Sequence, residues 1–112
     1  MEQKYLEQSS LGMDANVAAL LSYLLGFITG IIFYVLEKEN KFVRFHAMQS
    51  IIVFGFFIVV SIIALVVPVI GPVISGLANL ASLVLWVILM IKAYQGEKFK
   101  LPVAGDIAEQ KA

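Results

Sequence analysis

The sequence contains no cysteine and only one histidine, and charged residues make up just 14% of its 112 positions. Without cysteine there is no disulfide, no thiolate metal site and no cysteine nucleophile. One histidine without clustered carboxylates cannot supply a set of metal ligands, and it gives the serines of the apolar segments no base within reach. We therefore expect no catalytic, metal or cofactor site, and the sequence predicts a protein that is not an enzyme.

Charge is missing altogether from two long stretches, Ala15 to Leu36 and Ala47 to Ile91. Hydrophobic residues reach 61% of the chain, against about 45–50% in a typical soluble domain. A soluble fold of this size could not hide so much apolar surface from water. The composition thus predicts an all-α membrane protein in which residues 1–112 form one domain.

The acidic and basic residues balance, with eight of each, so the formal net charge is zero. A general electrostatic attraction to nucleic acid has no support in such a chain, and no nucleic-acid partner is expected. The expected partner is membrane lipid. Residues 1–14 lack the basic region of a cleavable signal peptide, so we expect the first apolar segment to be retained.

The first uncharged stretch, residues 15–36, has the length of one transmembrane helix. It would form about 33 Å of helix, against a hydrocarbon core of roughly 30 Å. The second stretch is about twice as long, and Pro68, Gly71 and Pro72 interrupt it near its middle. We expect a tight hairpin of two helices, residues 47–67 and 73–91, and hence three transmembrane helices in all.

A charged connector, residues 37–46, joins the first two spans, and a tail, residues 92–112, follows the third. Asn40 could cap a helix that runs from the connector straight into the second span; a separate surface helix is the alternative. Only Lys4 among the eight Lys and Arg residues precedes the first span, and the other seven fall in the connector or the tail. This bias predicts a multi-pass plasma-membrane protein with its N-terminus outside and its C-terminus in the cytoplasm.

Small residues recur at every fourth position of the first predicted span, at Ala18, Ser22, Gly26 and Gly30. Helices associate in lipid mainly by close backbone approach, which such a groove permits. The groove could pack against another helix of the same chain or against a second copy, so a homo-oligomer stays open.

A polar stripe lies on the third predicted span, where Ser75, Asn79 and Ser82 follow helical spacing. Such a stripe is unfavourable against lipid unless it meets a partner or water. Hydrogen bonding within the chain is one interpretation, and a polar pathway lined by the stripe is the other.

The connector leads into the pattern His-Ala-x-Gln-Ser, which ends at Ser50. Together with the run from Asn16 to Gly30, it resembles a widespread prokaryotic family of small membrane proteins of unknown function, over residues 11–100. That family is distantly similar to the channel subunit of the chloroplast inner-envelope protein translocon. The resemblance implies a three-helix membrane protein without an assigned activity, and the distant relation implies a role in a translocation pore. The plastid subunit has four spans, whereas three are predicted here.

Four residues match the motif of this family: Arg44, His46, Gln49 and Ser50. Together with Lys41 they are candidates for contact with anionic lipid head groups, to which each basic residue near the surface would contribute about 1 kcal/mol.

The leading hypothesis is a non-enzymatic structural or translocon-like component of the prokaryotic plasma membrane, which contacts itself or a larger membrane partner. A holin-like pore former is one alternative, suggested by the small size, three spans and charged tail. A passive channel lined by Ser75, Asn79 and Ser82 is another.

Overall fold

The computed structural model describes residues 8–112, which form five helices and no strand. The helices are α1 (Ala15–Leu24), α2 (Phe27–Leu36), α3 (Lys41–Ala64), α4 (Ile70–Tyr94) and α5 (Ala104–Lys111). The all-α prediction is confirmed for this part of the chain. Lys4, which entered the orientation count, lies outside the described residues.

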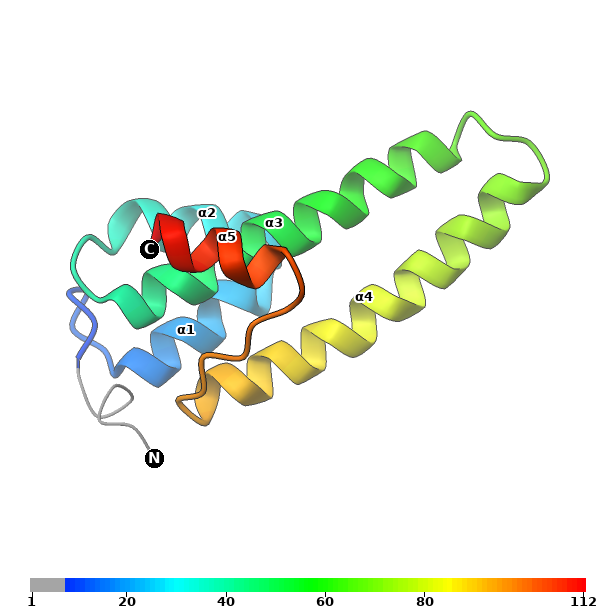
Figure 1. The fold of residues 1–112 in the computed structure, drawn as a ribbon. Coiled ribbons are helices and arrows are strands. Elements are labelled where there is room, and N and C mark those ends of the chain that lie inside the picture. Colours follow the sequence, from blue (N-terminus) through cyan, green and yellow to red (C-terminus); the bar gives the residue numbers. More distant parts are fainter. Residues whose placement is uncertain (1–7) are drawn as a thin grey trace.

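The two longest helices, α3 and α4, form a hairpin, and the other three helices gather around one half of it (Figure 1). We call this the packed half: α1, α2, α5 and the adjoining parts of α3 and α4, residues 41–54 and 83–94. Residues 55–82 form the bare half, which extends beyond the other helices and ends in the turn at residues 65–69 (Figure 1).

The first predicted span is not one helix. α1 ends at Leu24, α2 begins at Phe27, and the chain reverses between them at Gly26, whose φ of 60° suits glycine and few other residues (Figure 1). Two helices, α3 and α4, are long and apolar enough to cross a membrane, whereas α1 and α2 have ten residues each. The prediction of three transmembrane helices is therefore wrong, because the first apolar stretch is a helical hairpin.

The connector helix continues into the second apolar stretch, which resolves one of the open alternatives. α3 begins at Lys41, and the side chain of Asn40 accepts hydrogen bonds from the backbone amides of Phe42 at 3.0 Å and Val43 at 3.1 Å. These bonds satisfy two of the donors that a helix N-terminus leaves unpaired. The predicted boundary at residue 47 was too late by about two turns because the charged residues before it are helical.

The expected hairpin between α3 and α4 is present, and its turn has a counterpart later in the chain. Pro68-Val69-Ile70-Gly71 starts α4, and Pro102-Val103-Ala104-Gly105 starts α5. In both turns the valine has φ 67° and ψ −58°, and the amide after it donates to the proline carbonyl at 2.7 Å. The repeated Pro-Val-x-Gly pattern is visible in the sequence, but its meaning as a helix-starting turn was missed.

The N-terminal segment and the connector lie at the same end of the molecule. The backbone amide of Ser10 donates to the Glu37 carboxylate at 3.0 Å, and the Asn16 side chain donates to the carbonyl of Tyr94 at 2.9 Å. Three parts of the chain therefore meet there: the start of α1, the connector and the end of α4. A single crossing by residues 15–36 would have separated the first two, so the prediction of opposite sides does not agree with these contacts.

Candidate functional site

Four of the five residues singled out around the family motif lie in the packed half, as does Tyr23 of α1. We call this set of residues the polar clamp: Tyr23, Arg44, His46, Gln49 and Ser50. Tyr23, His46, Gln49 and Ser50 are fully buried, and Arg44 is half-buried. Because buried polar groups are unfavourable unless they are hydrogen-bonded, their partners show what the motif does.

His46 links α1 to the C-terminal segment. Its Nε2 lies 2.9 Å from the carbonyl oxygen of Glu97, and its Nδ1 lies 2.7 Å from the hydroxyl of Tyr23. A carbonyl can only accept, so Nε2 carries the proton and Tyr23 donates to Nδ1. The rings of Tyr23, Phe42 and Phe45 meet the imidazole edge to face. This neutral imidazole therefore has both nitrogens engaged and none free to act as a base.

Gln49, one turn further along α3, completes the same network. Its Nε2 donates to the Tyr23 hydroxyl at 3.0 Å and to the carbonyl of Phe99 at 2.9 Å, while its Oε1 accepts from the amide of Leu101 at 2.9 Å. One side chain thus satisfies two backbone groups of an irregular segment that would otherwise be left unpaired. Gln49 and His46 together hold the segment between α4 and α5 against α3.

The reversal between α1 and α2 is also closed by side chains. Ser50 Oγ donates to the carbonyl of Gly26 at 2.8 Å, and Trp86 Nε1 of α4 donates to the carbonyl of Tyr23 at 2.8 Å. The hydroxyl of Thr29 bridges the two helices, since it accepts from the amide of Leu25 at 3.0 Å and donates to the carbonyl of Ser22 at 3.1 Å. The turn therefore does not depend on water for these groups.

Arg44 closes the other end of α2. Its guanidinium donates to the carbonyls of Tyr34 at 2.9 Å and Glu37 at 2.7 Å, and it lies 4.1 Å from the centre of the Tyr34 ring. A cation at a helix C-terminus also interacts favourably with the helix dipole. Arg44 thus fixes the end of the α1–α2 hairpin to the first turns of α3.

Glu37 has the opposite charge and holds the N-terminal segment. Its carboxylate accepts hydrogen bonds from the hydroxyls of Ser9 and Ser10 and from three backbone amides, those of Ser10, Glu39 and Asn40. Burial alone would raise the pKa of Glu37, but these hydrogen bonds outweigh burial and lower the pKa from 4.5 to about 2. In the sequence Glu37 is one of two acidic residues in the connector, and nothing there distinguished it from Glu39, so this role was not predicted.

These contacts bear on the predicted lipid head-group site. His46, Gln49 and Ser50 have no exposed surface in this arrangement, and their polar atoms have partners within the chain. Lys41 is exposed at the start of α3 and stays a candidate for such contact. Within residues 8–112 no three His, Asp or Glu side chains lie close enough to hold a metal ion.

The predicted small-residue groove does not run along one helix. Ala18 and Ser22 lie on α1, Gly26 is in the turn, and Gly30 lies on α2. Ala18, Ser22 and Gly30 are buried within the chain. A Cβ on Gly30 would lie 3.0 Å from the carbonyl oxygen of Ala47, so α2 packs closely on α3 at this glycine. The groove residues in the described structure thus make intramolecular contacts.

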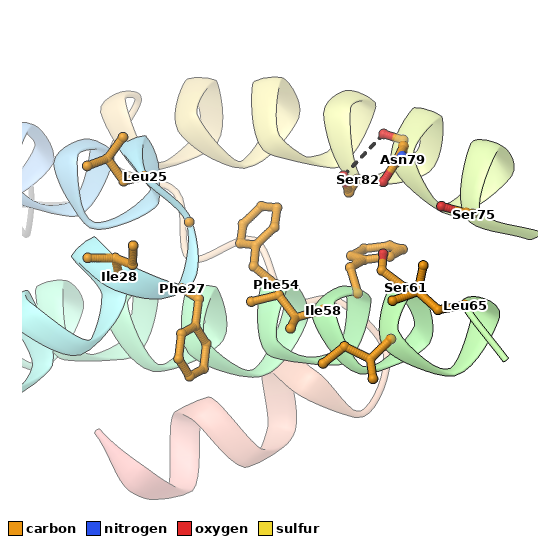
Figure 2. A pocket seen from close by; sticks show the side chains of 13 residues that line it. Leu25, Phe27, Ile28, Phe54, Ile58, Ser61, Leu65, Ser75, Asn79 and Ser82 are labelled. Carbon is orange, nitrogen blue, oxygen red and sulfur yellow. Dashed lines mark hydrogen bonds between the residues drawn. The ribbon is translucent and has the colours of Figure 1, made fainter. Parts of the chain in front are cut away.

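The polar stripe lines an open groove in the bare half. Ser75, Asn79 and Ser82 of α4 face Phe54 and Ser61 of α3 and Leu65 of the following turn across a space of about 560 Å³, with the α1–α2 turn at one end (Figure 2). The hydrogen bond within the stripe runs from Ser82 Oγ to the backbone carbonyl of Asn79 at 3.1 Å. The Asn79 side chain is exposed. Unlike the polar clamp, the stripe leaves polar groups accessible.

Comparison with known proteins gives consistent matches over almost the whole chain. A UPF0132 membrane protein of Methanocaldococcus jannaschii is 59% identical over 106 residues, which cover 95% of this chain and 96% of the relative. One from Archaeoglobus fulgidus is 52% identical over 98 residues, covering 88% and 95%. No solved structure matches. These matches do not bear on the predicted similarity to the plastid channel, which stays a prediction.

A further relative carries a more specific name. The magnetosome protein MmsF of Paramagnetospirillum magneticum is 30% identical over 105 residues, which cover 92% of this chain and 94% of the relative. The model of the magnetosome magnetite crystal formation protein family, which includes MamF and MmsF, matches residues 7–108. The coverage, the membrane-protein relatives and the two membrane-length helices agree. The chain therefore belongs to this family of small prokaryotic membrane proteins.

Proposed function

We propose that this protein is a non-enzymatic scaffold of the membrane that assembles with further copies of itself through the bare half of the α3–α4 hairpin. The observation that carries the proposal is that the side chain of Asn79 is exposed. It lies on α4, and only 6% of the most apolar, membrane-length stretch of this helix is buried within the chain. Around it, α4 exposes large apolar residues such as Leu77 and Leu80. A primary amide on such a surface needs a hydrogen-bonding partner.

A second copy supplies that partner at the right depth. Among the described residues, the bare half carries no charged side chain, and Asn79 is its one side-chain amide. Two copies related by a twofold axis that passes close to Asn79 would bring these amides together. Hydrogen bonds between membrane helices contribute about 0.6–2 kcal/mol each. The serines and the open groove beside Asn79 leave room for a close approach.

The hydrogen bonds of the polar clamp also support a non-enzymatic role. Its side chains are engaged with the backbone of α2, the α1–α2 turn and the segment after α4. Residues that match the family motif are thereby accounted for by the fold. None of them is left as a free nucleophile or base in the described structure.

The magnetosome relative gives this scaffold a biological setting. That relative is named a magnetosome protein, and the family is described by magnetite crystal formation. By analogy, assembly of this chain would organise a patch of membrane rather than bind a mineral directly.

The test is oligomer size in lipid nanodiscs and in detergent, measured by light scattering after size-exclusion chromatography. The unaltered protein should form a defined oligomer, and Asn79→Leu should weaken its association about 3- to 30-fold. Leu77→Ala, a change at an exposed apolar residue of the same helix, is the control and should leave association nearly unchanged. A monomeric parent protein, or equal association by Asn79→Leu, would contradict the proposal.

A passive channel is the second candidate, because hydroxyl and amide groups of Ser61, Ser75 and Asn79 line the same groove. Solute flux in liposomes that Asn79→Leu abolishes would favour the channel over the scaffold. The holin-like alternative was based partly on three predicted spans, and the structure has only two helices of membrane-spanning length within the described residues. Abrupt lysis on controlled overexpression is the result that would restore it.

A further inference from the structure

The α1–α2 hairpin has the length of half a bilayer. Each helix contains ten residues, or about 15 Å of helix, and the hydrocarbon core is roughly 30 Å thick. Two such helices placed side by side reach the middle of the membrane and return. They cannot cross it.

The outward surface of this hairpin is apolar. α2 exposes Ile28 by 59%, Val35 by 54% and Leu36 by 53%, and the turn exposes Leu25 by 63%. Together with Leu24, Ile31 and Ile32, these side chains form a continuous face without a charged residue. A patch of this kind on an element already packed against the protein on its other side suits contact with lipid acyl chains.

Charge is confined to one end of the hairpin. Asp14 precedes α1 and Glu37 follows α2, while Leu25 and Gly26 form the opposite, uncharged tip. The described Lys and Arg residues lie in the connector, the last turn of α4 and the C-terminal segment. Lys111 of α5 is joined to this end through its carbonyl, which accepts from the Tyr34 hydroxyl at 2.7 Å. The hairpin thus has one water-facing end and one apolar tip.

Several backbone groups at the tip of the hairpin have hydrogen-bonding partners within the protein, as a position in the bilayer interior requires. Irregular backbone is tolerated at membrane depth only where protein or enclosed water satisfies its polar groups. The carbonyl of Gly26 has Ser50, those of Tyr23 and Leu24 have Trp86, and the amide of Leu25 has Thr29.

From these observations we propose that the α1–α2 hairpin is a re-entrant element whose apolar face contacts the acyl chains of a single leaflet. The N-terminal segment, the connector and the C-terminal segment then share one side of the membrane. α3 and α4 cross the bilayer, and the apolar turn at residues 65–69 reaches the opposite interface. The concentration of Lys and Arg places the shared side in the cytoplasm.

The absence of cysteine makes a direct test simple, because single cysteines can be introduced at exposed positions of the full chain. Closed vesicles of each orientation are treated with a maleimide that does not cross membranes. Leu11→Cys, Lys38→Cys and Gln110→Cys should react only from the cytoplasmic side, and Val66→Cys only from the other. Ile32→Cys should react from neither side until detergent is added.

The three-span arrangement gives a different pattern. Reaction of Leu11→Cys and Lys38→Cys from opposite sides would show that residues 15–36 cross the membrane and would overturn the proposal. Reaction of Ile32→Cys from the cytoplasmic side before detergent would show that the hairpin lies in water. Failure of Leu11→Cys to react from either side would also contradict it. None of these outcomes depends on oligomer formation.

Discussion

The packed half and the bare half of this molecule differ in whether their polar side chains have hydrogen-bonding partners within the chain. In the packed half, buried polar side chains are numerous, and none of their buried nitrogen or oxygen atoms within residues 8–112 lacks a partner. In the bare half, polar side chains are few, but Asn79 is exposed beside an open groove. The polar groups of the packed half are satisfied within one chain, whereas in the proposed assembly those of the bare half are satisfied by a second copy.

Because of this difference, we expect substitutions in the two halves to affect different properties of the protein. Loss of one hydrogen-bonding side chain in the packed half leaves other buried groups without partners, and the penalty appears as lost stability. In the proposed assembly, the same loss in the bare half would remove an intermolecular contact and leave the fold of the chain intact. Stability and association therefore report on different regions.

The largest loss of stability is expected from Gln49→Leu. The change removes three hydrogen bonds and leaves the half-buried amide of Leu101 and carbonyl of Phe99 without this partner. At about 1–3 kcal/mol for each orphaned group, the free energy of unfolding should fall by about 2–6 kcal/mol. Gln95→Leu, at an exposed position after α4, is the control. Unfolding titrations in detergent would measure both, and equal stabilities would contradict the role of the clamp.

Two glycines of α4 give a matched pair in the bare half. A Cβ on Gly71 would lie 2.1 Å from the carbonyl oxygen of Ala64, whereas one on Gly76 would meet nothing within 4 Å. Gly71→Ala should destabilise the α3–α4 turn by about 1–3 kcal/mol. Gly76→Ala should be neutral or stabilising by up to about 1 kcal/mol, because alanine favours helix. Thermal denaturation should separate the two, and the same shift in both would contradict the turn geometry.

Arg44→Gln should reduce stability by about 1.5–3 kcal/mol, since it removes charged hydrogen bonds to two carbonyls at the end of α2. Lys41→Gln, one turn earlier on the exposed surface of α3, provides the comparison and should change stability little. Cysteine reactivity at Leu36 would show whether the end of α2 has loosened. An equal effect of both changes would indicate a response to charge rather than to capping.

A further prediction concerns the dependence of stability on pH. The pKa of Glu37 is about 2 in the folded chain and 4.5 in its reference state, so its ionised form stabilises the fold above about pH 4.5. That stabilisation should decline as the pH falls from about 4.5 through about 2. Glu37→Gln should remove this part of the pH dependence, and Glu39→Gln, at an exposed carboxylate, should retain it. A titration unchanged by Glu37→Gln would contradict the assignment.

The sequence was informative wherever a local pattern carried the answer. The Pro68–Pro72 corner predicted the hairpin, and Asn40 indicated one of the two alternatives for the start of α3. The reversal at Gly26 could not be found in this way, because residues 15–36 have the length and hydropathy of one ordinary span. Their turn is stabilised by Ser50 and Trp86, which come from distant parts of the chain.

The role of the family motif could not be predicted from a local pattern either. The pattern from Arg44 to Ser50 singled out these residues, and head-group contact was inferred from their charge and their place beside the membrane. Burial and hydrogen bonds instead direct His46, Gln49 and Ser50 inward. Only the fold shows that residues 97–101 return to meet them.

The central claim is that residues 15–36 reverse and bring the N-terminal segment back to the connector. The most direct measurement is the distance between spin labels at Leu11→Cys and Lys38→Cys in lipid nanodiscs, by pulsed electron paramagnetic resonance. The amide of Ser10 lies 3.0 Å from the Glu37 carboxylate, so the account predicts one short distance, well below the thickness of the hydrocarbon core. A single distance of about 30 Å or more would place the labels on opposite faces and contradict it.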